Sequence, residues 1–312
     1  MTHATATPTL KMGVPIPNGK LGMWLFLGTE IMFFTAFIGT YIVVRMGSPG
    51  WPTDPAVTHI KVALGGINTF VLICSSVSVV LAHEAMAQRN FKRATDWIIA
   101  TLLLACVFLG IKSVEYYGKF DHDILPGRIP ETETLALDKL QRELDSAFKT
   151  SELAVLRKKL ADWEKTPDAE TKYAAEIKKS QDRVTALGPV EQSYKELRTK
   201  IKGREIDLHQ AEEQLTALKS AAQNENFARG LSSVHEPHVI LYGNMFASSY
   251  FIMTGFHALH VVIGMFMFGG IIWLGKTQRL GSQHGVLVEN CGLYWHFVDL
   301  VWIFLFPLLY II

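Results

Sequence analysis

The sequence predicts an all-α fold: a polytopic membrane helix bundle of five transmembrane helices with an extramembrane antiparallel coiled-coil insert. Two observations point to it. Of the 59 Lys, Arg, Asp and Glu residues in the 312-residue chain, 37 lie within residues 131–230. Outside that block, five apolar stretches reach the roughly 20 residues that a helix needs to cross a bilayer. The net charge of +1 also excludes a protein that binds polyanions through bulk electrostatics.

The five predicted spans are defined by length and by the scarcity of charge inside them. A buried core helix can imitate one such stretch, but not five. The spans lie at residues 21–44, 62–82, 97–117, within 239–275, and 289–312. They divide the chain into an N-terminal segment (1–20), spans one to three (21–120), the insert (121–238) and spans four and five (239–312).

Lys and Arg residues in the short connecting segments predict the orientation, because such residues accumulate on the cytoplasmic side. With the N-terminus inside, the inner segments hold seven Lys and Arg and the outer segment between spans one and two holds two. Counting Lys119, Arg128 and Arg229, which flank the insert, raises the outer number to five. We therefore expect the N-terminus inside, and the C-terminus and the insert outside.

Residues 131–222 predict amphipathic helices with a heptad-like seam. Apolar side chains alternate at spacings of four and three, the rhythm with which coiled coils bury a seam. The main run comprises Val190, Tyr194, Leu197, Ile201, Leu208, Ala211, Leu215 and Leu218, with Arg204 as its polar interruption. Residues 153–163 and 173–187 keep the same rhythm upstream.

Two proline-containing pairs predict where these helices stop. Thr166-Pro167 suits an N-cap followed by a proline at the first helical position, and Gly188-Pro189 suits a terminal glycine before a new helix. Because span three must be rejoined to span four, we expect one hairpin with its tip at Gly188-Pro189 and a kink near Pro167. Its second helix, from 190 to about 222, would project on the order of 50 Å.

Two interpretations of the insert remain open. It is either a solvated spacer or a docking arm for another membrane complex or a soluble electron carrier. Its nearly balanced charge favours protein–protein docking over electrostatic capture of a basic carrier.

Glu30 lies ten residues into the first span, near mid-depth. A charged carboxylate there costs about 2.5–3.5 kcal/mol on insertion scales, so it should face protein or water, or be protonated. One interpretation is an acid that handles protons or organises lipid headgroups. The other is a neutral acid that makes a helix-packing hydrogen bond.

Spans four and five each carry a polar stripe. In span four, His257 and His260 share a helical face, but two imidazoles alone are an incomplete site for zinc or copper. In span five, Glu289, His296 and Asp299 share a face beside Trp302. A buried Asp–His couple either relays protons or locks helices together, and the spacing does not decide between the two.

Two polar clusters flank the insert and could meet if its base closes. Their residues are Asp121, His122, Asp123, His235, Glu236 and His238. A zinc site there is a hypothesis. The three cysteines lie in apolar runs and predict neither a disulfide framework nor a thiolate cluster. The chain also carries no nucleophile elbow, Walker loop or dinucleotide fingerprint, and we expect no catalytic residue and no redox centre in it.

Five segments, in order along the chain, resemble subunit III of the haem–copper cytochrome c oxidases. They are residues 24–37 (WLFLGTEIMFFTAF), 67–86 (INTFVLICSSVSVVLAHEAM), 111–120 (IKSVEYYGKF), 253–264 (MTGFHALHVVIG) and 294–310 (YWHFVDLVWIFLFPLLY). Agreement over five segments is far more specific than one motif. By this resemblance, Glu30 is the family's in-membrane glutamate near subunit I, and His83, Glu115, His257, His260, His296 and Asp299 occupy family positions.

The resemblance implies a non-catalytic subunit of a proton-pumping terminal oxidase in a bacterial inner membrane, with the insert on the periplasmic side. Haems and copper would lie in subunits I and II. Subunit I would be the principal partner and subunit II a further one, and phospholipid would bind to this chain. The family commonly has seven helices, and this chain lacks the first two, so half of the lipid cleft is missing or supplied by a neighbour. The family does not ordinarily carry the outer insert.

Three rival interpretations stay open. The chain could be the corresponding subunit of a quinol oxidase or an accessory subunit of a nitric oxide reductase, which differ in their electron donors. It could instead be a membrane tether whose function resides in the coiled coil. A tether leaves the intramembrane polar residues unexplained, because an anchor does not need them.

Overall fold

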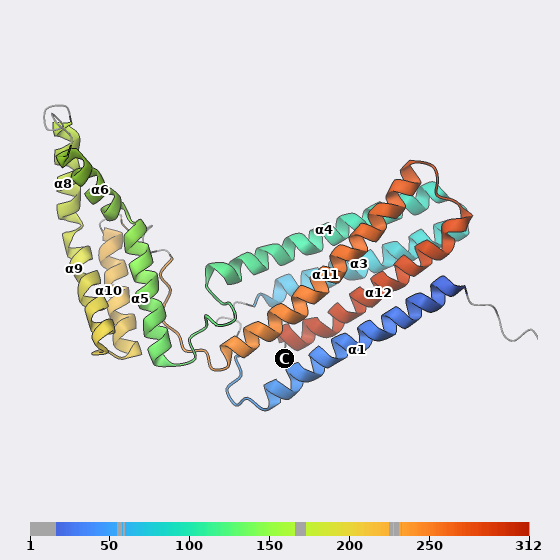
Figure 1. Cartoon of the computed structure of the whole chain (residues 1–312), viewed down its shortest axis with the longest axis horizontal. Coiled ribbons are helices and arrows are strands. Elements are labelled where there is room, and N and C mark those ends of the chain that lie inside the picture. Colours follow the sequence, from blue (N-terminus) through green and yellow to red (C-terminus); the bar gives the residue numbers. More distant parts are fainter. Residues whose placement is uncertain are drawn as a thin grey trace, which may run out of the picture. The chain divides into compact units, whose positions relative to one another are not determined.

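The computed structural model describes residues 17–54, 58, 60–165, 173–224, 227, 231 and 233–311. All regular elements among these residues are helices (Figure 1). The chain forms two compact units. The membrane unit holds the described residues up to 46, 60–114 and from 249, and the insert unit holds those of 47–58 and 115–248.

Among the described residues, five helices are long and apolar enough to cross a bilayer, which confirms the predicted membrane bundle. They are α1 (Asn18–Met46), α3 (Val62–Ala87), α4 (Phe91–Asp121), α11 (Gly243–Lys276) and α12 (Gly285–Phe306), and α12 continues into the π-helical turn η3 (Pro307–Ile311). The observed helices extend beyond the predicted spans. The last turns of α4 and the first turns of α11 belong to the insert unit.

Helix α12 is the central helix of the membrane unit, because it packs against both α3 and α1. Within its hydrophobic span 56% of the residues are buried, against 6% in α1. Gly264 of α11 lets that helix approach α12 closely: a Cβ at this position would lie 2.7 Å from the Trp295 ring. Almost the whole length of α1 therefore faces outward from the unit, toward lipid or another protein.

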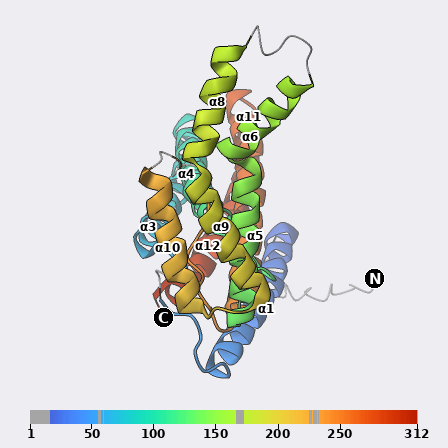
Figure 2. The ribbon, with the colours of Figure 1, turned by 90° about the vertical axis from the view of Figure 1, so that its left-hand side faces the viewer.

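Within the part of the insert unit that the structure describes, five further helices are present (Figures 1 and 2). They are α5 (Glu133–Thr150), α6 (Glu152–Glu164), α8 (Ala174–Ala186), α9 (Gly188–Gly203) and α10 (Leu208–Asn224). Thr132 and Ser151 begin α5 and α6 as N-caps, each accepting a hydrogen bond from a backbone N–H three residues on. Helices α5, α9 and α10 enclose a leucine-rich core, and α6 packs against α8.

The predicted continuous helix from 190 to 222 is wrong. Helix α9 ends at Gly203, and Arg204 adopts a left-handed conformation with φ of 53°. Asp207 then caps α10: its carboxylate accepts from the Gln210 N–H at 2.8 Å, and the Gln210 side chain accepts from the Asp207 N–H. The seam itself is buried as expected, since Leu197, Leu215 and their neighbours share one core. It is divided between two helices, so the arm predicted from residue 190 to 222 is not one continuous helix.

The predicted hairpin tip at Gly188-Pro189 is also wrong. Leu187 is helical, and the Glu191 N–H donates to its carbonyl at 3.1 Å, so α9 follows α8 without a reversal (Figure 1). Pro189 is accommodated in the first turn of α9, where its missing N–H has no helical partner to lose. Helix α6 instead packs against α8, and α9 packs against α10. The predicted kink at Pro167 lies outside the described residues.

Candidate functional site

Glu30 of α1 and His260 of α11 form a pair inside the membrane unit. Oε2 of Glu30 lies 3.1 Å from Nε2 of His260, and both side chains are largely buried. Phe34 and Phe297 place their rings edge-on around the imidazole, and the Tyr294 hydroxyl donates to the His260 carbonyl at 3.0 Å. The sequence indicated each residue as polar and intramembrane, but not that the two are partners.

The hydrogen bonds of His260 define what the pair can do chemically. Its Nδ1 lies 2.8 Å from the Phe256 carbonyl, which can only accept, so Nδ1 carries a proton. The bond to Glu30 then requires one further proton, either on the carboxylic acid or on Nε2. In both arrangements the pair has no net charge, which suits its depth in a bilayer. The pair can therefore hold one transferable proton.

His257 does not join His260 in a common site. Its ring is 1% exposed and lies between Phe108 of α4 and Trp302 of α12. Neither ring nitrogen makes a hydrogen bond with a described residue. The spacing of His257 and His260 places both on one helical face. Their rings nevertheless contact different neighbours, so they do not form one site.

Lys112 forms a second intramembrane polar cluster that the sequence analysis did not identify. It is 4% exposed, and its ammonium donates to the hydroxyls of Tyr310 and Tyr250 at 2.6 and 3.2 Å. The same ammonium lies 4.8 Å from the centre of the Trp302 ring. These contacts connect α4, α11 and the last turn of the chain. A lysine near a span end is usually expected to reach toward the membrane surface, which explains the omission.

The polar face of α12 attaches this helix to α3. Ser76 lies 2.6 Å from Nδ1 of His296, and the indole N–H groups of Trp295 and Trp302 donate to Ser75 and Thr69 at 2.9 and 3.0 Å. Asp299 is 4% exposed, and its carboxylate makes no hydrogen bond of good geometry with a described residue. His296 therefore bonds to α3 rather than to Asp299, an arrangement typical of helix locking.

The remaining predicted intramembrane residues lie apart from these clusters. Glu289 pairs with Lys20 at 2.6 Å, and both are about one-third exposed, so this contact ties the start of α12 to the start of α1. His83 is exposed on α3. Glu115 is 4% exposed, and Lys119, one turn further along α4, donates to the Thr58 carbonyl at 3.0 Å.

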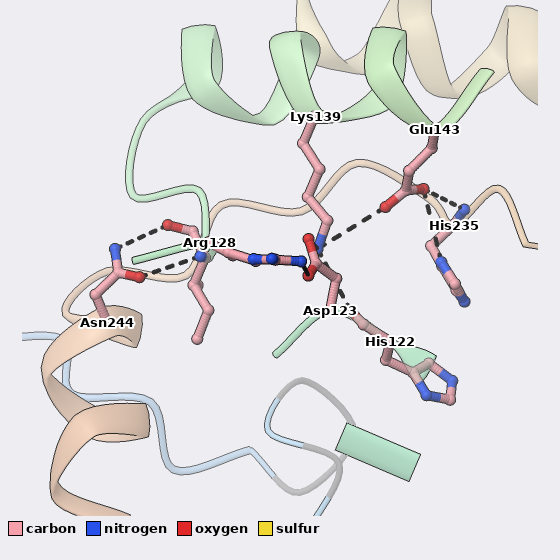
Figure 3. Close-up of polar contacts among 8 residues, drawn as sticks. His122, Asp123, Arg128, Lys139, Glu143, His235 and Asn244 are labelled. Atoms are coloured by element: carbon pink, nitrogen blue, oxygen red, sulfur yellow. Dashed lines mark hydrogen bonds and ion pairs between the residues drawn. The ribbon is translucent and has the colours of Figure 1, made fainter. Parts of the chain in front are cut away.

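The two polar clusters that flank the insert do meet (Figure 3). The rings of His122 and His235 lie 4.9 Å apart, and Glu143 of α5 accepts a hydrogen bond from the backbone N–H of His235 at 2.9 Å. Asp123 pairs with Arg128 at 3.1 Å and more loosely with Lys139. Among the described residues, no group of three His, Cys, Asp or Glu side chains could hold a metal ion. The structure gives the zinc hypothesis no support.

Asn244 closes the base of the insert. Its side chain accepts from the Ile129 N–H at 3.1 Å and donates to the Ile129 carbonyl at 2.9 Å (Figure 3). Its own N–H donates to Glu131 at 3.0 Å. These hydrogen bonds join the segments by which the chain enters and leaves the insert.

Asp145 of α5 connects that helix to α9 through two donors, the Tyr194 hydroxyl and the Arg198 guanidinium, both at 2.7 Å. Partial burial raises the pKa of Asp145, but these hydrogen bonds outweigh it and hold the pKa below its usual value. Burial and the bond to Asp145 raise the pKa of Tyr194 to about 12. The neutral phenol and the ionised carboxylate are thus the forms that the fold favours.

Comparison with known families identifies the membrane helices and leaves out most of the insert. The family model for cytochrome c oxidase subunit III matches residues 4–121 and 232–312. This match is well over half of the chain, and residues 122–231 lie outside it.

Individual relatives are also named as subunits 3 of oxidases. Cytochrome c oxidase subunit 3 of Thermostichus vulcanus is 42% identical over 99 residues, which cover 30% of this chain and 47% of the relative. The protein of the same name from Alkalihalophilus pseudofirmus is 36% identical over 100 residues, 32% of this chain and 48% of the relative. The chain thus spans about half the length of these two relatives. Quinol oxidase subunit 3 of Bacillus subtilis is 21% identical over 291 residues, 93% of this chain and 85% of the relative.

Proposed function

The chain belongs to the cytochrome c oxidase subunit III family, and we propose that it acts as a non-catalytic subunit of a proton-pumping haem–copper terminal oxidase. In this role it supports assembly, lipid binding and proton uptake, while the haems and copper are held by subunits I and II. The observation that carries the proposal is the Glu30–His260 pair, a buried acid and base that share one proton within the membrane unit.

The position of the pair supports a role beside a partner subunit. Glu30 lies on α1, whose hydrophobic span is only 6% buried in this chain. Because Glu30 is already paired with His260, the surface left for lipid or a partner subunit is the exposed apolar face of α1. Subunit I and bound phospholipid are the partners that we propose for this surface.

The proposed location is a bacterial inner membrane. The Lys and Arg distribution favours a cytoplasmic N-terminus and supports a periplasmic C-terminus and insert. The insert lies almost entirely outside the family match, so we propose for it a separate role as a docking surface for another respiratory complex.

A quinol oxidase is the second candidate complex. The similarity to quinol oxidase subunit 3 of Bacillus subtilis extends over 93% of this chain, and the donor-binding parts of either complex would lie on other subunits. Measuring whether the purified complex oxidises reduced cytochrome c or a quinol distinguishes the two.

Replacement of Glu30 by glutamine tests its role in proton uptake, because the glutamine side chain has nearly the same shape but cannot take up or release a proton. We expect E30Q to co-purify with subunit I but to slow proton uptake severalfold, or to shorten the working lifetime of the oxidase at high pH. The matched control is E289Q, which removes an acid whose ion pair is one-third exposed. Normal uptake and lifetime in E30Q would rule out this role.

A further inference from the structure

A cavity of about 570 Å³ lies in the insert unit, between α5, α10 and the segments that lead from α4 and into α11. Its volume falls in the range of small-molecule sites, about 300–1,000 Å³. Much of its lining is apolar, and these side chains are Ile124, Ile129, Ala136, Leu140, Val234 and Ile240. Most of them are buried, so the apolar lining is part of the folded unit rather than a loose surface patch.

The acid at the inner wall of this cavity already has partners. Glu143 accepts from the His235 N–H at 2.9 Å, and its other oxygen lies 3.9 Å from the Lys139 ammonium (Figure 3). Lys139 also lies 3.9 Å from Asp123 and donates to the His122 carbonyl at 3.4 Å. The other acid, Glu236, is about half exposed and lies 3.9 Å from His238. Glu143 thus shares its negative charge with Lys139, and solvent screens the charge of Glu236.

Lys219 is different. It lies half-buried on α10 at the cavity wall and makes no hydrogen bond or ion pair with a described residue. An ammonium beside an apolar cavity is a single positive charge that a single negative charge would complement. The imidazoles of His235 and His238 line the same cavity and add N–H groups that can donate, whereas Nδ1 of His122 already bonds to the Gly118 carbonyl at 2.8 Å.

We propose that this cavity binds an amphiphilic monoanion, an acyl chain that ends in a carboxylate. The chain lies on the apolar floor and the carboxylate pairs with Lys219. Ile124 follows the end of α4 by three residues, and Ile240 precedes the start of α11 by three. Because both helices are candidate spans, the floor is only a few residues from the membrane, where such amphiphiles concentrate.

Hydrogen exchange of the full chain in phosphatidylcholine nanodiscs tests the proposal, because it separates cavity binding from partition into the lipid. The probe is dodecanoate, compared with neutral dodecanol and with acetate. We expect dodecanoate to slow exchange in residues 133–150 and 233–242, and dodecanol and acetate to have little effect at the same concentration. The variant K219Q should raise the half-saturating dodecanoate concentration about tenfold.

The control variant is K202Q, which removes an exposed lysine of α9 that does not line the cavity and should bind like the wild type. Restored binding in K219R would support a charge-dependent contact. Three results would overturn the proposal: no protection by dodecanoate in the wild type, equal protection by dodecanol, or equal binding by K219Q and K202Q.

Discussion

The membrane unit buries several polar side chains among its apolar ones, whereas the core of the insert helices is apolar. The interior of the membrane unit holds polar residues, including Asn68, Lys112, His257 and Asp299, none more than 4% exposed. The insert unit buries mainly leucine, isoleucine, valine and alanine from α5, α9 and α10, and leaves its ion pairs at the surface. The two units of this chain are thus packed in different ways, each suited to its surroundings.

The difference follows from the medium around each unit, which is water for the insert and lipid for the membrane helices. In water, burying apolar surface stabilises the insert by about 25 cal/mol per Å². In a bilayer the surroundings are as apolar as the core, so close packing and interhelical hydrogen bonds hold helices together. We therefore expect apolar truncations to act most strongly in the insert, and changes in close packing or hydrogen bonding to act most strongly in the membrane unit.

The largest expected effect is that of L215A in the insert core. Leu215 is fully buried, and its truncation should lower the free energy of unfolding of the insert by about 2–5 kcal/mol. Hydrogen exchange in α9 and α10 should accelerate accordingly, and thermal unfolding of the membrane helices in detergent should not change. The control is L135A, because Leu135 is 47% exposed. Equal effects of the two variants would contradict a leucine-based core.

The next effect concerns close packing in the membrane unit. In G264A the added methyl group would lie 2.7 Å from the Trp295 ring, and overpacking of this kind costs about 1–3 kcal/mol. On the same helix, Gly255 has nothing within 4 Å of an added Cβ, so G255A should be neutral or slightly stabilising. Thermal unfolding of the detergent-solubilised chain compares them. A G264A midpoint equal to that of G255A would disprove the close approach of α11 and α12.

A smaller effect is expected for W302F, which removes the hydrogen bond from the indole to Thr69. Interhelical hydrogen bonds in membranes contribute about 0.6–2 kcal/mol. W273F is the control, because Trp273 is 58% exposed on α11. Unfolding in mixed micelles should show a lower free energy of unfolding for W302F but not for W273F. A similar decrease in W273F would argue against a stabilising hydrogen bond between α12 and α3.

The smallest effect is a dependence of insert stability on pH. The folded-state pKa of Tyr194 is raised to about 12, so its contribution is complete below the usual value of 10 and is lost as pH rises toward 12. For Asp145 the folded-state pKa is lowered, so its contribution is lost as pH falls below 3.8. In Y194F the alkaline loss should disappear. If the melting temperatures of wild type and Y194F differed by the same amount at pH 9 and at pH 11.5, Tyr194 would not be the cause of the alkaline loss of stability.

The sequence predicts the membrane unit well, because length and hydrophobicity alone define a span. The partners of its polar residues cannot be predicted in the same way. Glu30 and His260 are 230 residues apart, and only the packing of α1 near α11 brings them together. Lys112 resembles a lysine at a span end until Tyr250 and Tyr310 are seen to surround its ammonium.

The insert shows where periodicity misleads. The heptad rhythm continues across Arg204, so a pattern of apolar residues alone predicts one helix through it. Gly203 before a left-handed residue, and Asp207 with Gln210 as a capping box, are the local signals of the break. The burial of the apolar seam was predicted correctly because α9 and α10 face the same core. The break between the two helices depends instead on Gly203, Asp207 and Gln210.

The central claim is that the membrane unit carries the family's role and that the insert is a separable addition. Deletion of residues 133–235, rejoined by a short Gly-Ser segment, tests it most directly. The deletion keeps both Ile129 and Asn244, whose hydrogen bonds close the base of the insert. We predict that the shortened chain still co-purifies with the haem-bearing subunits and that their oxygen consumption stays at the wild-type rate. Loss of the complex, or of its turnover, would contradict the claim.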